Sequence, residues 1–187
     1  MVLRKIIWAL RLLLRKPFFK KVGKYSYLGP TIALKGIKNI SLGEKVRIYP
    51  GARMETYNTG EIIIEDNCSI GQNFHVTSSE KKLIIGKGST ILGNTFVTNI
   101  DHEYVNIGVP ILEQQMKVRD TVIGENCFIG FGASIQAGTK LGKQCIVGTN
   151  AVVRGEFPDY CVIVGAPARI VKKYNESTGI WEKVKND

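Results

Sequence analysis

Along residues 123–153 of this 187-residue chain, an aliphatic residue recurs at every sixth position. A small residue stands four positions after most of them, and a glycine often follows the aliphatic residue directly. The aliphatic positions are Ile123, Ile129, Ile135, Leu141, Val147 and Val153, and the small positions are Cys127, Ala133, Thr139, Cys145 and Ala151. A period of six fits neither a helix nor simple strand alternation, and it is the repeat of a parallel β-helix.

The repeat has a geometric explanation. Each six-residue unit supplies one short strand and one turn, and three units complete a triangular coil that stacks on the next at strand spacing. The aliphatic side chain fills the core, the small residue points inward where a larger one would not fit, and the glycine lets the backbone turn sharply. With slips in register, the pattern extends back through Leu42, Ile64 and Ile85. We therefore predict an all-β protein with a solenoid over residues 25–173.

Residues 1–24 follow a helical pattern instead, and Pro17 is expected to end the helix. One side of this helix is apolar and another is basic. The apolar side comprises Leu3, Ile6, Ile7, Leu10, Leu13 and Leu14, and the basic side comprises Arg4, Arg11 and Arg15. Two interpretations stay open. The helix caps the open end of the solenoid, or residues 1–22 lie as a basic amphipathic segment on an anionic membrane surface.

Two further segments depart from the repeat. Residues 103–120 are polar and interrupt an otherwise strict solenoid, and such long excursions usually carry function. After Val153 the chain passes through the motif Val-Gly-Ala-Pro-Ala-Arg, which ends at Arg169. We predict that residues 174–187 form a short basic C-terminal helix.

The charge of the chain is concentrated at one end. The first 25 residues hold eight of the 26 basic residues and none of the 16 acidic ones, so the rest of the chain is near neutral. A nucleic-acid-binding protein more often spreads basic groups along its main face, so we expect no nucleic-acid partner. No run reaches the ~18 apolar residues of a membrane span. Because Arg11 and Arg15 interrupt the apolar segment that otherwise resembles a signal peptide, we expect a cytoplasmic protein, working at the inner membrane face if the helix binds lipid.

The four cysteines are Cys68, Cys127, Cys145 and Cys161, and three of them occupy the small inward position of the repeat. They lack the paired spacing of zinc ligands, so we expect no metal site. We interpret them as buried thiols in a reducing compartment.

The chain has two histidines, His75 and His102. His102 follows Asp101 where the repeat gives way to the polar excursion, which would place its side chain at the edge of a coil beside a bound substrate. Histidine titrates near neutral pH and suits a general base. A lone histidine is more often structural, so position alone does not decide its role.

The six-residue repeat, the Asp-His pair and the closing motif together resemble the left-handed β-helix (hexapeptide-repeat) acetyltransferases, roughly over residues 40–173. The resemblance is greatest to sugar O-acetyltransferases of the maltose/galactoside type and to those of capsule, O-antigen and colanic acid biosynthesis. It implies left-handed coiling, which the period alone does not fix.

The resemblance also implies direct acetyl transfer from acetyl-CoA, as co-substrate, to a sugar hydroxyl of a surface polysaccharide or its precursor. His102 would take the proton of the acceptor, and Asp101 would hold the loop or the imidazole. A backbone N–H near Gly130 or Phe131 would stabilise the developing oxyanion. Many sugar acetyltransferases have a small residue where Phe131 stands, so the acyl pocket differs here.

CoA is expected along the later coils, in a groove between subunits of a homotrimer, with His102 of one subunit facing the later coils of its neighbour. Small residues there would admit the pantetheine arm, and basic ones would meet the phosphates. The matching positions are Gly130, Phe131, Gly132, Thr149, Arg154, Gly155, Arg169 and Lys172. For Arg154 and Lys172 an ordinary surface charge is the alternative. The expected acceptor contacts are His75, Asn99, Glu103 and Tyr104, with an ordinary edge histidine as the alternative for His75.

Other functions remain in competition. A zinc carbonic anhydrase on the same solenoid needs three histidine ligands, which two histidines per chain do not supply. Serine acetyltransferases carry a large helical N-terminal domain, and acyl-carrier-protein-dependent acyltransferases usually end in a longer helical domain. An acetyltransferase for a small amine, a sugar nucleotide or another small acceptor is one alternative. A non-catalytic scaffold is another, although it would not need Asp101 and His102.

Overall fold

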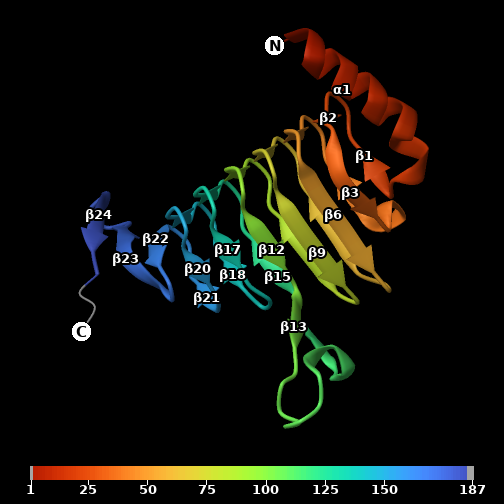
Figure 1. The fold of residues 1–187 in the computed structure, drawn as a ribbon. Coiled ribbons are helices and arrows are strands. Elements are labelled where there is room, and N and C mark those ends of the chain that lie inside the picture. Colours follow the sequence, from red (N-terminus) through yellow and green to blue (C-terminus); the bar gives the residue numbers. More distant parts are fainter. Residues whose placement is uncertain (1, 185–187) are drawn as a thin grey trace.

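The computed structural model describes residues 2–184, in which short parallel strands wind into a triangular solenoid (Figure 1). Each face of the prism is one parallel sheet. The first sheet consists of β1 (Lys21–Val22), β4 (Ile40–Leu42), β7 (Glu61–Ile64), β10 (Lys82–Ile85), β15 (Thr121–Ile123), β18 (Lys140–Leu141) and β21 (Glu156–Phe157). The second consists of β2 (Tyr27–Leu28), β5 (Arg47–Ile48), β8 (Ser69–Ile70), β11 (Thr90–Ile91), β16 (Phe128–Ile129), β19 (Ile146–Val147) and β22 (Cys161–Gly165). The third consists of β3 (Thr31–Lys35), β6 (Ala52–Tyr57), β9 (His75–Ser79), β12 (Phe96–Thr98), β17 (Ser134–Ile135) and β20 (Val152–Val153).

The core of the solenoid follows the predicted pattern, which confirms the parallel β-helix. Stacked aliphatic residues such as Ile85 and Ile123 pair in register between neighbouring coils and are fully buried. The small positions are also buried, and the polar one among them is satisfied, because Thr139 Oγ1 donates a hydrogen bond to the carbonyl oxygen of Val153 (3.0 Å). Small side chains therefore line the interior where the three sheets meet, and the larger aliphatic ones fill the space between them.

The glycines of the repeat have a different cause from the one expected. Among the described residues, those that directly follow an aliphatic position do not have a positive φ, whereas Asn126 and Gln144 two positions further on do (57° and 50°). The next coil passes so close that a Cβ on Gly71 would lie 2.5 Å from the backbone nitrogen of Gly93. These glycines are needed for coil stacking, and asparagine supplies many of the left-handed turns because it tolerates that conformation.

The N-terminal segment forms the predicted helix, α1 (Val2–Arg15), followed by the 3-10 turn η1 (Lys16–Phe18) that contains Pro17. Figure 1 shows α1 lying across the first coils at one end of the solenoid. Leu12 is its fully buried side chain there, whereas Leu10 on the apolar side predicted from the sequence stays exposed. The solenoid itself starts at β1, before the boundary predicted at residue 25, and a further 3-10 turn, η2 (Ile37–Asn39), lies in its second coil.

The polar excursion leaves the prism between β12 and β15, as predicted (Figure 1). Its two arms, β13 (Ile100–His102) and β14 (Met116–Val118), pair antiparallel, and the turn η3 (Ile111–Glu113) lies near its tip. Gln114 is buried within it and binds three backbone groups, including the carbonyl oxygen of Val109 (2.9 Å). The excursion is thus an ordered arm with its own polar core.

The predicted C-terminal helix is wrong for the residues that the structure describes. β23 (Ala168–Asn175) turns back antiparallel on β22, and β24 (Ile180–Lys183) pairs with β23, so both extend the second sheet. The carboxamide of Asn175 accepts hydrogen bonds from the N–H groups of Ser177 and Thr178, and Gly179 has a φ of 72°, which makes a tight turn. The boundary predicted at residue 173 therefore falls inside a strand, and residues 185–187 of the predicted helix lie outside the described residues.

Candidate active site

The buried side-chain amide of Asn99 anchors the start of the excursion to the neighbouring coil. Asn99 is fully buried, and its Oδ1 accepts the N–H of Ser79 (2.9 Å). Its Nδ2 donates to the hydroxyl of Ser78 (3.0 Å) and to the carbonyl oxygen of Ser79 (3.1 Å). These bonds engage both amide hydrogens and the carbonyl oxygen inside the protein, which favours a structural role for Asn99 over the expected contact with the acceptor.

Hydroxyl groups tie the two ends of the excursion together. Thr98 Oγ1 accepts hydrogen bonds from the hydroxyl of Thr77 (2.8 Å) and from the N–H of Ile100 (3.0 Å). Thr121, where the chain re-enters the solenoid, donates to the carbonyl oxygen of Thr98 (2.9 Å). The base of the arm is therefore held from both sides, which limits how far the residues just beyond it can move.

Asp101 holds the backbone of the excursion against the later coils. One carboxylate oxygen accepts the N–H of His102 (3.0 Å), and the other accepts Nη2 of Arg154 (2.5 Å). Burial alone would raise the pKa of Asp101, but these two donors outweigh it and hold the pKa below its usual value. Asp101 thus positions the loop through its backbone and reaches β20, and it makes no hydrogen bond to the imidazole of His102 among the described residues.

His102 lies half-buried at the end of β13, opposite Met116 of β14. Its Nδ1 is buried and has no hydrogen-bond partner in the part of the chain that the structure describes. A buried polar atom without a partner is unfavourable, and such atoms concentrate where a substrate or a second subunit binds. The backbone of His102 is therefore held in place, while its buried Nδ1 has no hydrogen-bond partner within residues 2–184.

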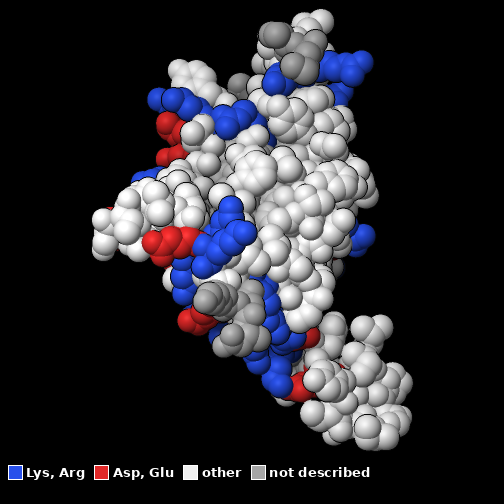
Figure 2. All heavy atoms as spheres, turned by 90° about the vertical axis from the view of Figure 1, so that its left-hand side faces the viewer, with Lys and Arg blue, Asp and Glu red and all other residues white. Residues whose placement is uncertain are grey.

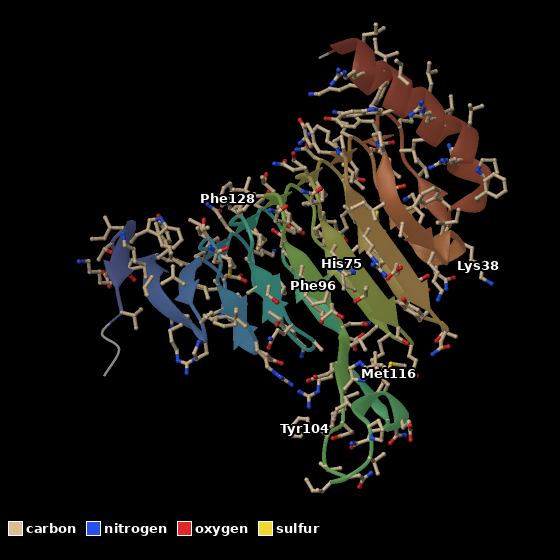
Figure 3. All side chains as sticks on the ribbon, in the orientation of Figure 1. Lys38, His75, Phe96, Tyr104, Met116 and Phe128 are labelled. Atoms are coloured by element: carbon tan, nitrogen blue, oxygen red, sulfur yellow. The ribbon has the colours of Figure 1, made fainter. Side chains whose placement is uncertain are left out.

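The remaining excursion candidates separate into a structural and an exposed position. Glu103 forms an ion pair with Lys117 on the facing strand, which closes the arm beyond His102. Tyr104 points into solvent with 75% of its surface exposed, and Figure 3 places it beyond β13 on the outer part of the excursion. The side chain of Tyr104 is accessible to an acceptor, whereas the carboxylate of Glu103 is already paired with Lys117.

His75 begins β9 on the third sheet, one coil before β12, the strand from which the excursion leaves. Its ring packs on that of Phe96 in the next coil (centroids 5.0 Å apart; Figure 3), and β13 contacts β9, on which it stands. Among the described residues its Nε2 is buried without a hydrogen-bond partner. Burial, and then the positive charge of Arg53, lower the pKa of His75 below its ordinary value, which favours the neutral imidazole.

Sequence reasoning missed the charged group beside His75. Arg53 stands in register with His75, and its Nη2 forms an ion pair with Oε1 of Glu55 (3.1 Å). Tyr57 donates a hydrogen bond to the other oxygen of Glu55 (3.2 Å), and the ammonium of Lys35 lies 4.2 Å from the centre of the Tyr57 ring. The alternating polar residues of β6 were a signal of an outward polar face, but the slips of register in the early coils concealed that they stack on His75.

Three of the predicted CoA residues meet at the C-terminal end of the solenoid. Arg154, Gly155 and Arg169 line one depression of about 380 Å³, together with Lys173. Gly155 has a φ of 112°, and no described atom lies within 4 Å of the place where its Cβ would be, so the backbone there is open to a ligand. Lys172, also predicted, stands on β23 opposite Lys183 and does not line this depression.

The other predicted donor residues lie on a different edge of the prism. Gly130–Gly132 form the turn between the second and third sheets, and Thr149 lies in the equivalent turn one coil later. Gly130 is buried, and a Cβ there would come within 2.6 Å of the backbone nitrogen of Thr149, so coil stacking explains this glycine. Gly132 has a φ of 70°, and the ring of Phe131 is 42% exposed.

The same turn decides which N–H could face an oxyanion. The N–H of Gly130 donates to the carbonyl oxygen of Val147 (2.8 Å), so this donor already has a partner within the solenoid. The N–H of Phe131 makes no hydrogen bond to another described residue. Phe131 is therefore the one of the two expected positions whose backbone donor is still free.

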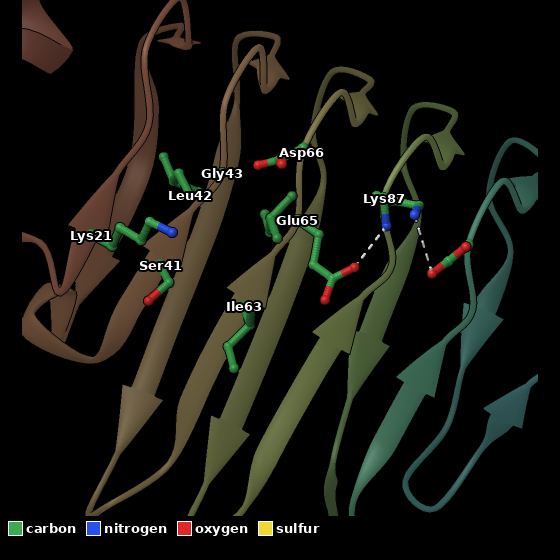
Figure 4. A pocket seen from close by; sticks show the side chains of 10 residues that line it. Lys21, Ser41, Leu42, Gly43, Ile63, Glu65, Asp66 and Lys87 are labelled. Carbon is green, nitrogen blue, oxygen red and sulfur yellow. Dashed lines mark hydrogen bonds and ion pairs between the residues drawn. The ribbon is translucent and has the colours of Figure 1, made fainter.

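A further depression, of about 440 Å³, lies on the first sheet and contains none of the predicted site residues (Figure 4). Two of its acidic side chains interact with Lys87. The backbone N–H of Lys87 donates to Glu65 (3.0 Å), and the ammonium of Lys87 lies 3.6 Å from the carboxylate of Glu125. Within residues 2–184 no three His, Cys, Asp or Glu side chains gather in a way that could hold a metal ion.

Comparison with known proteins matches these features to one family. Residues 120–155 match the model described as bacterial transferase hexapeptide (six repeats). The chain is 32% identical over 152 residues to the putative lipopolysaccharide biosynthesis O-acetyl transferase WbbJ of Escherichia coli K12, covering 78% of this chain and 77% of that protein. The chain belongs to the hexapeptide-repeat acetyltransferases. The solenoid is accordingly a left-handed β-helix, and this acetyltransferase is an acyltransferase enzyme.

More distant relatives agree with this assignment. The acetyltransferase is 24% identical over 148 residues to the galactoside O-acetyltransferase of Lactococcus lactis, over 68% of this chain and 70% of that protein. Among solved structures, the N-acyltransferase AntD of Bacillus cereus, as a mutant in complex with dTDP and coenzyme A, has the same fold. The TM-score is 0.74 at 19% identity, over 90% of this chain and 91% of that one.

Proposed function

We propose that this acetyltransferase transfers the acetyl group of acetyl-CoA to a sugar hydroxyl of a surface polysaccharide or its precursor, with His102 as general base. The observation that carries the proposal is the ion pair between Asp101 and Arg154. It joins the excursion that bears His102 to the depression lined by Arg154, Gly155 and Arg169. The similarity to WbbJ supports an oxygen acceptor on a cell-surface glycan.

Transfer would proceed in one displacement at the thioester. His102 accepts the proton of the acceptor hydroxyl while the oxygen attacks the thioester carbonyl, and the C–S bond breaks as the tetrahedral oxyanion collapses. The imidazolium then returns its proton to the CoA thiolate, which gives the ester and free thiol. The N–H of Phe131 is the donor that we assign to the oxyanion, and a donor of this kind is typically worth ~2.7–4 kcal/mol of barrier.

The third sheet is the proposed acceptor surface. His75, whose buried Nε2 has no hydrogen-bond partner among the described residues, lies beside the exposed guanidinium of Arg53 and the ring of Phe96, and this combination of polar groups and an aromatic face supports the assignment. A pyranose ring has the same combination of polar edge and apolar face, which supports a carbohydrate acceptor. Tyr104 at the outer part of the excursion completes the proposed contacts.

We propose a homotrimer with sites between subunits, and the two separate groups of predicted donor residues support it. Arg154 and Gly155 lie on the same edge of the prism as the excursion, whereas Phe131 and Thr149 lie on the edge between the second and third sheets. The two groups therefore lie on different edges of one chain. Rotation about a three-fold axis places one edge of a chain against a different edge of its neighbour, and cyclic closure is common among homo-oligomers. Light scattering should give the mass of three chains.

We place the enzyme in the cytoplasm, because its described cysteines are free thiols buried in the core. Residues 25–173 are the proposed acyltransferase unit, with residues 1–24 as an N-terminal segment and 174–187 as a C-terminal tail. The solenoid and its excursion hold every residue to which we assign a role in transfer.

The proposal is tested by thiol release from acetyl-CoA with a panel of sugars, nucleotide sugars, polysaccharide fragments and small amines. Thiol release that depends on an acceptor with a hydroxyl group supports O-acetylation. Thiol release with amines alone would show that the enzyme is an N-acetyltransferase instead. Arg169→Ala should weaken CoA binding, with Lys38→Ala on the exposed η2 turn as the matched control. If millimolar CoA neither binds nor reacts, the protein is a scaffold and the proposal fails.

A further inference from the structure

Helix α1 presents three different sides around its axis. At ~100° per residue, Lys5, Trp8 and Leu12 share one side, and Leu3, Leu10 and Leu14 share another. Arg4, Arg11 and Arg15 lie along the narrow strip between these two sides. A helix that only covered the end of the solenoid would need one apolar side. The second apolar side of α1, with Leu3, Leu10 and Leu14, therefore requires another explanation.

The first side fastens α1 to the solenoid. Leu12 is buried, and the ring of Trp8 packs on that of Tyr27 (centroids 5.9 Å apart). The ammonium of Lys5 lies over the rings of Tyr27 (5.7 Å) and Tyr49 (5.5 Å). The helix is therefore held in a fixed orientation relative to the coils, by aromatic and cation–π contacts on one side only.

The second side is left uncovered. Leu3, Leu10 and Leu14 are 71%, 56% and 78% exposed, which is unusual for three leucines in a row along one helix face. An apolar depression of about 450 Å³ continues this surface from Leu10 to Tyr25, whose side chain is itself 80% exposed. The apolar surface thus runs from the helix onto the first coil.

The segment that carries this surface is basic along its sequence, although Lys20 at its end pairs with Glu61 of β7. Residues 1–25 contain eight basic residues and no acidic residue. Figure 2 shows Lys and Arg side chains at the top of the molecule, where Figure 1 places α1. An apolar strip bordered by arginines, with an exposed tyrosine beside it, matches the interfacial region of an anionic bilayer, where apolar side chains insert and basic ones meet the phosphates.

We propose that the exposed side of α1 and Tyr25 dock this enzyme on an anionic lipid bilayer surface. A second copy of the chain fits less well, because it would bring two surfaces of the same positive sign together. The helices described in residues 2–184 are too short and too polar to cross a membrane, so the contact is with the surface. The excursion projects from the opposite side of the molecule (Figure 1), so docking leaves the proposed active site accessible. This docking is independent of acetyl transfer.

The test is vesicle co-sedimentation of the full chain. Wild type should bind mixed phosphatidylcholine and phosphatidylglycerol vesicles, bind pure phosphatidylcholine weakly, and be released by high salt. The charge-neutral double variant Leu10→Gln with Leu14→Gln should lower the affinity at least about tenfold, because it removes two inserting side chains from exposed helix positions. The matched control is Ile180→Gln, because Ile180 is as exposed as Leu10 (57% and 56%) but lies on β24 at the other end of the solenoid.

Several outcomes would overturn the proposal. Equal binding of wild type to both vesicle types would refute docking on anionic lipid. An unchanged affinity in the leucine double variant would refute the role of this side of α1. If wild type does not bind vesicles but self-associates, and Leu10→Gln with Leu14→Gln abolishes the self-association, the exposed side of α1 binds a second copy of the chain instead. Arg11→Gln with Arg15→Gln provides an independent check, since it leaves the apolar side intact and should weaken binding to the anionic vesicles alone. Thiol release with a soluble acceptor should be unchanged in all these variants.

Discussion

Replacing Asn99 with alanine tests whether this residue roots the excursion or contacts the acceptor. The change removes three buried hydrogen bonds, of 2.9, 3.0 and 3.1 Å, to Ser78 and Ser79. At ~1 kcal/mol net for each bond, the loss is about 3 kcal/mol, and the buried backbone groups of Ser79 left without a partner add to it. For a chain of this size 1 kcal/mol corresponds to roughly 2–4 °C in Tm, so we expect a decrease of roughly 6–12 °C.

The assay is thermal unfolding, with Asn39→Ala as the matched control. The carboxamide of Asn39 makes a single long hydrogen bond (3.4 Å), so its loss should change Tm by less than about 4 °C. Equal melting temperatures for the two variants would refute the structural role. If Asn99→Ala instead raised KM for the acceptor with Tm unchanged, Asn99 would be the substrate contact expected from the sequence.

Three further outcomes follow from the core and the third sheet. All four cysteines are buried, and burial raises the pKa of the Cys68 thiol to about 11. A thiol reagent should therefore not react with the native protein and should titrate four thiols after denaturation; rapid native labelling would contradict the burial. Burial and Arg53 lower the pKa of His75 in the folded protein. As the pH falls below about 6.5, the imidazole of His75 therefore takes up a proton in the unfolded chain before it does so in the folded protein, and the free energy of unfolding should decrease. Unfolding midpoints of wild type and His75→Gln at about pH 7.5 and about pH 5.5 should show a smaller loss in the variant, and an equal loss would exclude His75 as the cause. Gly71→Ala would bring a Cβ within 2.5 Å of the backbone nitrogen of Gly93 and should cost about 1–3 kcal/mol in urea unfolding; an unchanged midpoint would mean that the coils can separate without cost.

The sequence predicted the solenoid well because its period is a direct consequence of stacking. Buried positions such as Ile123 and Cys127 recur wherever a coil closes, so side-chain size alone reveals them. The predicted C-terminal helix is wrong because the turn at Asn175 and Gly179 folds β24 back onto β23, and the basic composition of the tail does not reveal that turn. Local turn chemistry decided that segment.

The site was only partly predictable, for reasons of register and packing. The sequence indicated His102, Arg154 and Arg169, but it did not show that Asp101 bridges two of these regions. Arg53 and Glu55 were missed because their stacking on the coil of His75 depends on shifts in the early coils. For α1 the sequence left capping and membrane contact equally open, and the structure shows a helix that packs on one side while its predicted apolar side stays exposed.

The most direct test of the central claim separates donor binding from acetyl transfer in His102→Ala. The variant should bind acetyl-CoA with the affinity of wild type, because His102 is outside the depression that holds Arg154 and Arg169. Its single-turnover rate of acetyl transfer to the acceptor should decrease by about 10²–10⁴-fold, the usual contribution of a general base. A transfer rate equal to that of wild type, or a loss that lies entirely in acetyl-CoA binding, would contradict the assignment of His102 as the base.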